Sequence, residues 1–395
     1  MKKGLVAAIA ACALFATPVY AQAIKIGAVL TLTTPAAVIG NDMKAGMELA
    51  LEHIGGKIAG RDVDLIIRDD GLNVETGKQA TEQLVLQDDV DIVTGFIWSH
   101  ILLASADTVL EEGKILVSAN AGTSVLAGER CHKNFFNVSW QNDQTPEAMG
   151  ELLNRQGVKS LYIMSPDYAA GRDMANGVER TFKGEIVGKD LTVWPTQIDW
   201  ATELSSAKAA NPDGVFVFYP GGATMPFLTQ YQQAIGSDIP LYTVFTVDSL
   251  SLPRLQAAGL DYMLGTFQAM FWGPTWESGS PLDNAQNQRF VADFRAANDK
   301  YPSMFAAQAY DSVFFIKDAI ERAGGVDDID ALRTAMETTT FTSVRGPFRF
   351  GNNHFPIQNF YEREVVVDAD GTWTTIARDA VFIDAQDAHA SKCNL

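Results

Sequence analysis

The strongest constraint on the fold is an alternation of strand and helix patterns that runs along the chain and then starts again. In the first run, apolar β-branched segments alternate with segments whose apolar residues have helical spacing. This pattern predicts strands at 24–32, 63–68, 91–93 and 115–118, and helices at 40–54, 75–87 and 100–112. The second run predicts strands at 161–164, 192–194, 214–218 and 241–244, and helices from 145 and at 172–182, 201–209 and 225–234. Strands joined by helices pair in parallel, so we expect an α/β fold of two doubly wound lobes.

The last third of the chain breaks this alternation. It predicts helices at 285–300, 306–323 and 328–337, followed by a hairpin that turns at 368–371. Helices that bring no parallel strands of their own must pack on an earlier unit, so both lobes are expected to be discontinuous. We predict lobe 1 from 22–140 plus 271–346, lobe 2 from 141–270 plus 347–380, and a C-terminal tail at 381–395. Three hinge crossings then fall near 139–142, 267–272 and 345–350, with a cleft between the lobes.

The first residues read as an export signal. Lys2 and Lys3 precede a short apolar run, and small residues around Ala21 suit a signal peptidase, so 1–21 is predicted to be a signal peptide. Cys12 lies within that segment. In an oxidising compartment, the two remaining cysteines, Cys131 and Cys393, are expected to form a disulfide, with two free thiols as the alternative.

The negative net charge of the chain limits the classes of partner that it is expected to bind. The formal net charge is -18, and removing the two lysines of the signal peptide leaves 28 basic against 48 acidic residues, or -20. Such an acidic protein is not expected to bind nucleic acid or anionic membrane surfaces. A mature chain of roughly 370 residues exceeds the size of a single core, which agrees with two lobes.

The sequence offers no recognisable catalytic constellation. Its five histidines have no metal-ligand spacing, and no phosphate-binding loop or nucleophile elbow is present. We therefore predict that the protein is not an enzyme, with no catalytic residues, no metal and no cofactor. Ligands of open α/β sheets bind beyond the carboxyl ends of the strands, where the next helix offers free N–H groups. Five such corners occur, at 95–100, 118–124, 166–171, 219–223 and 245–248.

The order of these elements, with the stretches IKIGAVLTLTTPAAVIGNDMKAGMELALEHI, SANAGT, DYAAGRDMANG and GPFRF, resembles the type I periplasmic solute-binding proteins of the branched-chain amino acid ABC-importer family. The resemblance covers essentially the whole mature chain. It implies a monomeric periplasmic protein whose lobes close on a small carboxylate and deliver it to an inner-membrane ABC permease. It also implies a carboxylate held by Ser99, Ala121 and Thr123, a covering Tyr168, and Phe305 in the side-chain pocket. The full set of predicted ligand-binding residues is Trp98, Ser99, His100, Ala121, Gly122, Thr123, Tyr168, Gly221, Thr246, Phe271 and Phe305.

One position departs from the family pattern. Amino-acid binders of this family carry a glutamate for the ligand's ammonium where this chain has Thr246, followed by Val247 and Asp248. A threonine cannot neutralise a desolvated ammonium. Either Asp248 turns into the site or the ligand has no ammonium, and the many aromatic residues near the cleft favour the second reading. We therefore expect an aromatic acid of the benzoate or hydroxycinnamate kind. A branched-chain or other amino acid remains an alternative, and so does a ligand-sensing role in signalling.

Overall fold

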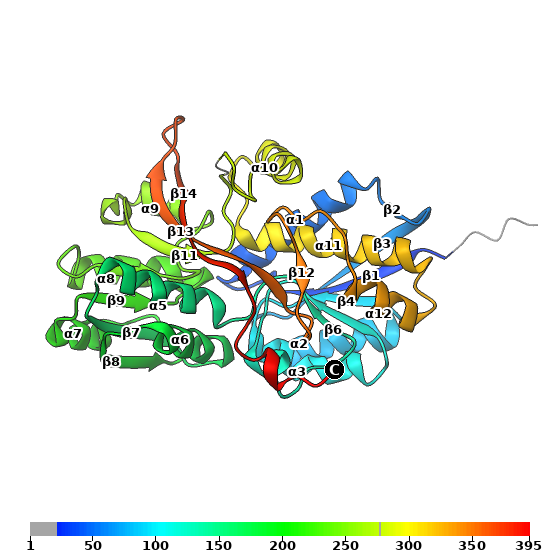
Figure 1. The fold of residues 1–395 in the computed structure, drawn as a ribbon, viewed down its shortest axis with the longest axis horizontal. Coiled ribbons are helices and arrows are strands. Elements are labelled where there is room, and N and C mark those ends of the chain that lie inside the picture. Colours follow the sequence, from blue (N-terminus) through cyan, green and yellow to red (C-terminus); the bar gives the residue numbers. More distant parts are fainter. Residues whose placement is uncertain (1–21, 276–277) are drawn as a thin grey trace, which may run out of the picture.

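The computed structural model describes residues 22–275 and 278–395, which form two lobes side by side, each built on one sheet (Figure 1). The predicted signal peptide, residues 1–21, lies outside the described residues. Over the ranges described, no helix is both long and apolar enough to cross a membrane.

Lobe 1 contains a six-stranded sheet. Its strands are β1 (Ile24–Leu30), β2 (Lys57–Ile58), β3 (Arg61–Asp69), β4 (Ile92–Gly95), β5 (Ile115–Ser118) and β6 (Phe135–Asn137). Their order is β2-β3-β1-β4-β5-β6, and every neighbouring pair is parallel except β2 with β3. The associated helices are α1 (Ala37–His53), α2 (Val74–Glu82), α3 (Ser99–Leu110) and α4 (Ser124–Ala127), and a π-helical turn at Gln83–Gln87 extends α2. Strands β4 and β5 are buried along their whole length, as continuous apolar runs between two helical layers require.

Lobe 2 contains an eight-stranded mixed sheet. Its strands are β7 (Ser160–Pro166), β8 (Glu185–Thr192), β9 (Gly214–Val217), β10 (Leu241–Thr243), β11 (Phe267–Met270), β12 (Arg349–Phe350), β13 (Pro356–Val367) and β14 (Trp373–Ala385). The order is β12-β13-β11-β10-β9-β7-β8, with β14 paired to β13 in a long hairpin. Its helices are α5 (Gln144–Gln156), α6 (Ala169–Thr181), α7 (Ala201–Ala210), α8 (Thr224–Ala234) and α9 (Leu252–Ala257), with 3-10 turns at Gly221–Ala223 and Asp261–Met263.

The predicted strand at 192–194 is wrong. The strand of this region is β8, which begins at Glu185 and ends at Thr192, and the following residues form a loop. β8 is the edge strand of its sheet, so most of its side chains are exposed or half-buried and its sequence carries charges instead of an apolar run.

The helices of the last third return to lobe 1, as predicted. They are α10 (Ala285–Asn298), α11 (Met304–Ala323) and α12 (Ile329–Glu337), and α11 packs along α1. β14 continues to Ala385, so residues 381–385, which were predicted to belong to the tail, are part of the lobe 2 sheet. The residues after Ala385 leave lobe 2 and return to lobe 1. Cys393 of this segment forms a disulfide with Cys131 of lobe 1, with a Cα–Cα distance of 5.7 Å. Figure 1 shows the red tail crossing to the cyan part of lobe 1, so the chain makes a fourth connection between the lobes.

The three predicted crossings lie together around the guanidinium of Arg345. This group pairs with Asp311 at 3.1 Å and donates to the backbone oxygens of Val138 and Ser139, the latter at 2.7 Å. Its Cζ also lies 5.4 Å from the ring centroid of Phe271. Both members of the ion pair are buried, so the first, second and third crossings are joined by one charged side chain in the interior.

Candidate functional site

A narrow cavity of about 20 Å³ lies between the two lobes, at the carboxyl ends of the strands. This volume holds about one water molecule, so the walls must move apart to admit a ligand. Its walls are mostly apolar and aromatic, and its polar groups include the hydroxyls of Ser99 and Tyr168 and the carboxamides of Asn120 and Asn142. The lining residues are Ile39, Ile97, Trp98, Ser99, Asn120, Ala121, Trp140, Asn142, Tyr168, Ala170, Met174, Phe218, Pro220 and Phe305. None of these described lining residues carries a charge.

The corner between β4 and α3 supplies the lobe 1 wall. Gly95 and Phe96 both have positive φ, at 101° and 62°. A Cβ at Gly95 would lie 2.4 Å from the backbone oxygen of Val29, so only glycine fits. The turn places Trp98 and Ser99 at the start of α3, where the N-cap residue makes no side-chain cap. The N–H of Ile101 donates to the oxygen of Trp98 at 3.1 Å, and the N–H groups of Ser99 and His100 before it have no side-chain cap.

Trp98 is held by a buried hydrogen-bond chain. Its Nε1 donates to Thr31 Oγ1 at 2.7 Å, and that hydroxyl donates to Asp70 Oδ1 at 2.6 Å. Burial raises the pKa of the Asp70 carboxyl. Because the indole N–H is already paired, Trp98 offers the cavity a flat ring and no donor.

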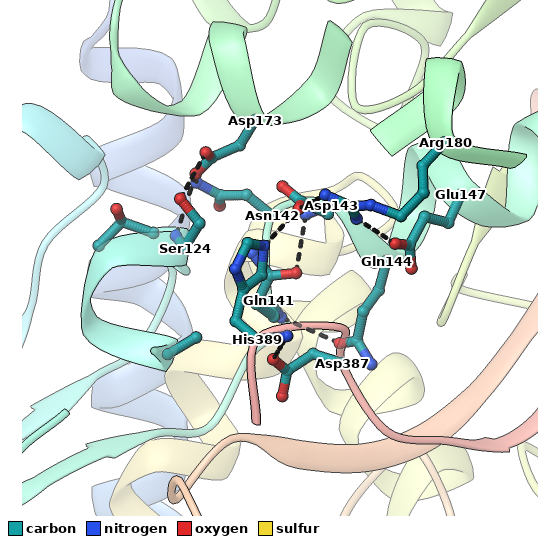
Figure 2. A network of polar contacts seen from close by, with 12 residues as sticks. Ser124, Gln141, Asn142, Asp143, Gln144, Glu147, Asp173, Arg180, Asp387 and His389 are labelled. Atoms are coloured by element: carbon teal, nitrogen blue, oxygen red, sulfur yellow. Dashed lines mark hydrogen bonds and ion pairs between the residues drawn. The ribbon is translucent and has the colours of Figure 1, made fainter. Parts of the chain in front are cut away.

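Ser99 and Asn142 meet from two different segments. Asn142 Nδ2 donates to Ser99 Oγ at 3.1 Å, which leaves the hydroxyl proton of Ser99 free for another acceptor. The same amide donates to Asp173 Oδ2 at 2.9 Å, and Asp173 also accepts from the backbone N–H and hydroxyl of Ser124. Burial raises the pKa of Asp173 to about 6, with a smaller contribution from Asp143. These bonds connect lobe 1, the first crossing and α6 in lobe 2 (Figure 2).

Lobe 2 closes the cavity with Tyr168, the N-cap residue of α6. Its ring makes edge contacts with Trp98 at 6.3 Å and with His100 at 5.2 Å between centroids. Tyr168 likewise makes no side-chain cap, so a second helix start is free on this side of the cavity. Further along α6, Ala170 and Met174 lie one turn apart and share the wall.

The predicted site residues divide into two groups. Trp98, Ser99, Ala121, Tyr168 and Phe305 line the cavity. The N–H of Ala121 donates to the backbone oxygen of Phe96 at 2.9 Å, so this residue presents its methyl group and no free amide.

The other predicted site residues of lobe 1 and the crossings lie close to the cavity but do not line it. His100 packs against Tyr168, and burial lowers its pKa to about 4, which makes the imidazole neutral at pH 7. Gly122 packs against the first crossing, where a Cβ would lie 1.9 Å from the oxygen of Trp140. Thr123 caps α4. Phe271 packs on Trp140 at 5.3 Å between centroids and beneath Arg345.

Two predicted residues of lobe 2 have other contacts. Gly221 approaches lobe 1, where a Cβ would lie 3.0 Å from Ile39. The hydroxyl of Thr246 accepts from the N–H of Tyr219 at 2.8 Å and donates to the oxygen of Val244 at 3.2 Å. Asp248 does not enter the main cavity either. It accepts from the N–H groups of Leu250 and Ser251 in its own turn, and burial raises its pKa to about 7.

Sequence reasoning missed several lining residues. Asn120 stands in the SANAGT stretch but was not chosen, and its amide is fixed by bonds to the backbone of Ile97 and to Gln308. Asn142 and Trp140 stand at the first crossing, where the sequence pattern predicts a hinge and does not by itself indicate ligand contact. Phe218 and Met174 look like ordinary core positions in the sequence, and no local signal separates them from core.

A second polar network extends from the first crossing to the C-terminal tail (Figure 2). Asp143 accepts from Arg180 of α6 at 2.8 Å and pairs with His389 of the tail at 2.6 Å. Arg180 also pairs with Glu147, whose pKa is raised by burial. The hydrogen bond with Asp143 raises the pKa of His389. The tail, covalently tied to lobe 1, is thereby attached to the first turn of α5 next to the hinge.

Comparison with known proteins agrees with this architecture. Residues 23–372 match the family described as periplasmic binding protein. A protein from Brucella melitensis called Leu/Ile/Val-binding protein homolog 6 is 27% identical over 94% of this chain and 95% of its own. A solute-binding protein of an ABC transporter from R. palustris, solved in complex with benzoate, is 29% identical with a TM-score of 0.85, over 94% of this chain and 100% of that one. Another from Rhodopseudomonas palustris BisB5, solved with 3,4-dihydroxybenzoic acid, is 25% identical with a TM-score of 0.85, over 93% of this chain and 99% of its own.

Proposed function

The chain belongs to the periplasmic binding protein family, and we propose that it captures an aromatic carboxylate in the periplasm for import. That it is a substrate-binding component of an ABC transporter and not an enzyme follows from the family and its structural relatives. The proposal concerns the ligand, the compartment and the delivery of the closed form to an inner-membrane permease.

The observation that carries the ligand class is the absence of a charged side chain among the described lining residues, combined with aromatic walls. An amino acid brings an ammonium group, and burying it without a carboxylate partner costs several kcal/mol, on the order of the penalty for an unpaired buried ion. Thr246 and Asp248 are both used within lobe 2. A ligand without an ammonium avoids this cost, and five aromatic rings of the wall suit a flat ring.

The carboxylate of the proposed ligand has hydrogen-bond donors in the cavity. The free hydroxyl proton of Ser99 and the uncapped starts of α3 and α6 provide hydrogen-bond donors and positive dipole ends. We therefore place the carboxylate at Ser99 and the aromatic ring between Trp98, Tyr168 and Phe305. Tyr168 and Asp173 reach across from lobe 2, so closing the lobes completes the site and encloses the ligand.

A titration panel tests this function. Benzoate and ring-substituted benzoates are compared with leucine, isoleucine and valine by calorimetry and thermal shift. We expect binding of at least one aromatic acid and no binding of the amino acids. If leucine or valine bound and no aromatic acid did, the amino-acid alternative would hold, which the curated relatives' names favour.

Ser99→Ala tests the placement of the carboxylate. A hydrogen bond to a charged group contributes about 1.5–3 kcal/mol, so affinity is expected to fall about 10- to 100-fold without unfolding. Ser105 lies on the same helix and is also buried, but it does not line the cavity. Ser105→Ala is the matched control and is expected to leave affinity unchanged. Equal affinities of the Ser99 variant and wild type would remove Ser99 from the site.

A further inference from the structure

Trp194 lies where the two lobes meet and is not among the predicted ligand-binding residues. It follows β8 in an exposed turn, where Val193 N donates to Gln197 Oε1 at 3.0 Å. The ring of Trp194 stacks on Tyr168 with centroids 5.2 Å apart and planes 19° apart. It also contacts Trp98 of lobe 1 at 5.3 Å. The residue therefore touches both rings that form the outer part of the ligand cavity.

On its other side, Trp194 borders a separate groove of about 260 Å³. Pro35, Ala36 and Leu72 of lobe 1 form one wall of this groove. Residues of the 194–200 loop and of the segment 222–226 in lobe 2 form the other. The groove is mostly apolar and shares no described lining residue with the ligand cavity. Trp98 and Tyr168 line the cavity, Trp194 lines the groove, and the three rings contact one another between the two spaces.

From this arrangement we infer that Trp194 closes the outer end of the ligand cavity and limits its ligands to compact single-ring acids. The inference rests on the proposed function and refines it, because it favours a carboxylate close to the ring over one on a longer arm. A shorter side chain at position 194 joins the cavity to the apolar groove. The rigid apolar extension of a longer acid can then enter the groove while the lobes stay closed.

The contact between Trp194 and Trp98 joins the two lobes, so a movement that separates the lobes would break it. Removing the ring therefore has two opposite effects. Compact acids lose a closing contact and bind more weakly, whereas elongated acids lose a steric barrier and bind more tightly. A residue with a purely structural role would change both affinities in the same direction.

The test measures dissociation constants of benzoate and biphenyl-4-carboxylate for wild type, Trp194→Ala and Trp194→Phe. For wild type we expect biphenyl-4-carboxylate to bind at least 100-fold more weakly than benzoate. Trp194→Ala is expected to reduce the ratio of the dissociation constant of biphenyl-4-carboxylate to that of benzoate at least tenfold. Trp194→Phe is expected to restore most of the wild-type ratio. Val193→Ala, which alters an exposed neighbour in the same turn, is the control and is expected to keep the wild-type ratio.

The inference is overturned if the ratio in Trp194→Ala stays within twofold of wild type, or if wild type already accepts both acids equally. If wild type binds amino acids and no aromatic acid, the proposed function fails while the size limit is still measurable. The ratio is then taken between valine and phenylalanine with the same variants and the same thresholds. Thermal unfolding of each variant shows that the comparison is made on folded protein.

Discussion

Replacing Arg345 by methionine should destabilise the protein strongly, because it leaves the buried carboxylate of Asp311 without its cation. Methionine keeps much of the apolar bulk of the arginine stem but none of its five donors. Asp311 would retain the hydroxyl of Ser343 at 2.7 Å and the N–H of Val344 at 3.1 Å. The backbone oxygens of Val138 and Ser139 would lose the guanidinium that now joins the crossings.

The expected loss in the free energy of unfolding can be estimated by two routes. Removing one partner of a buried ion pair costs about 3–5 kcal/mol. Alternatively, the stranded carboxyl takes up a proton. At pH 7, about three units above an ordinary aspartate pKa, this costs about 4 kcal/mol at roughly 1.4 kcal/mol per unit. Burial raises the pKa of Asp311 against the opposing effect of Arg345, so we expect the pKa of this carboxyl to be higher still in the folded variant.

The second route fixes the sign of the pH dependence. A folded-state pKa above the unfolded value means that the folded variant binds more protons, so its stability is lost as pH rises from about 4 towards the raised pKa. The deficit against wild type should therefore be about 4 kcal/mol at pH 7 and smaller at pH 5. It should fall by at most about 1.4 kcal/mol per pH unit, because the pKa of Asp311 is also raised in wild type. Guanidinium unfolding followed by tryptophan fluorescence measures both values.

A double variant completes the test. Asp311→Asn combined with Arg345→Met removes both charges, and it should recover about half of the loss or more, because no ion remains buried. Arg378→Met breaks an exposed pair with Glu364 and should cost about 0–1 kcal/mol. A cost below about 1 kcal/mol for Arg345→Met, or a double variant no more stable than the single one, would refute the reasoning.

Three further perturbations follow from the hinge region. Gly122→Ala places a Cβ 1.9 Å from a backbone oxygen of the first crossing, so we expect a lower melting temperature and weaker ligand binding, measured by thermal shift with and without ligand. Replacing Cys131 and Cys393 by serine removes a link across 262 positions, and the chain-entropy account predicts a loss of up to about 5 kcal/mol in denaturant unfolding. For His389→Asn, the deficit in melting temperature should be full below about pH 6.5 and shrink as pH rises through the folded pKa, because Asp143 raises the pKa of His389; a deficit equal at pH 6 and pH 8 would contradict this.

Much of the fold could be predicted because most of its helices and strands have a recognisable local sequence pattern. The buried strands are short apolar runs, and β4 is followed by α3, whose buried residues recur at helical spacing. The hairpin of β13 and β14 was predicted from alternation and its Asp-Gly turn, and Val367 pairs with Trp373 across it. β8 was not predicted correctly because it is an edge strand with exposed charged positions and so lacks an apolar run. The β-forming residues just after it led to the wrong strand prediction at 192–194.

The site could be predicted only where it coincides with a strand end. Ser99 and Tyr168 start helices directly after strands, so topology alone brings them to the cleft. Met174 and Phe218 reach it through the packing of lobe 2 on lobe 1, and no local pattern records that contact. The same holds for Trp194, whose role depends on two rings from distant parts of the chain.

The covalent return of the tail to lobe 1 has a practical consequence for anyone building a reporter from this protein. The first described strand, β1, and the disulfide at Cys393 both belong to lobe 1, so labels fused near either end travel on the same rigid body. Their separation would hardly change when the lobes close. An optical signal for closure needs one fluorophore on lobe 2.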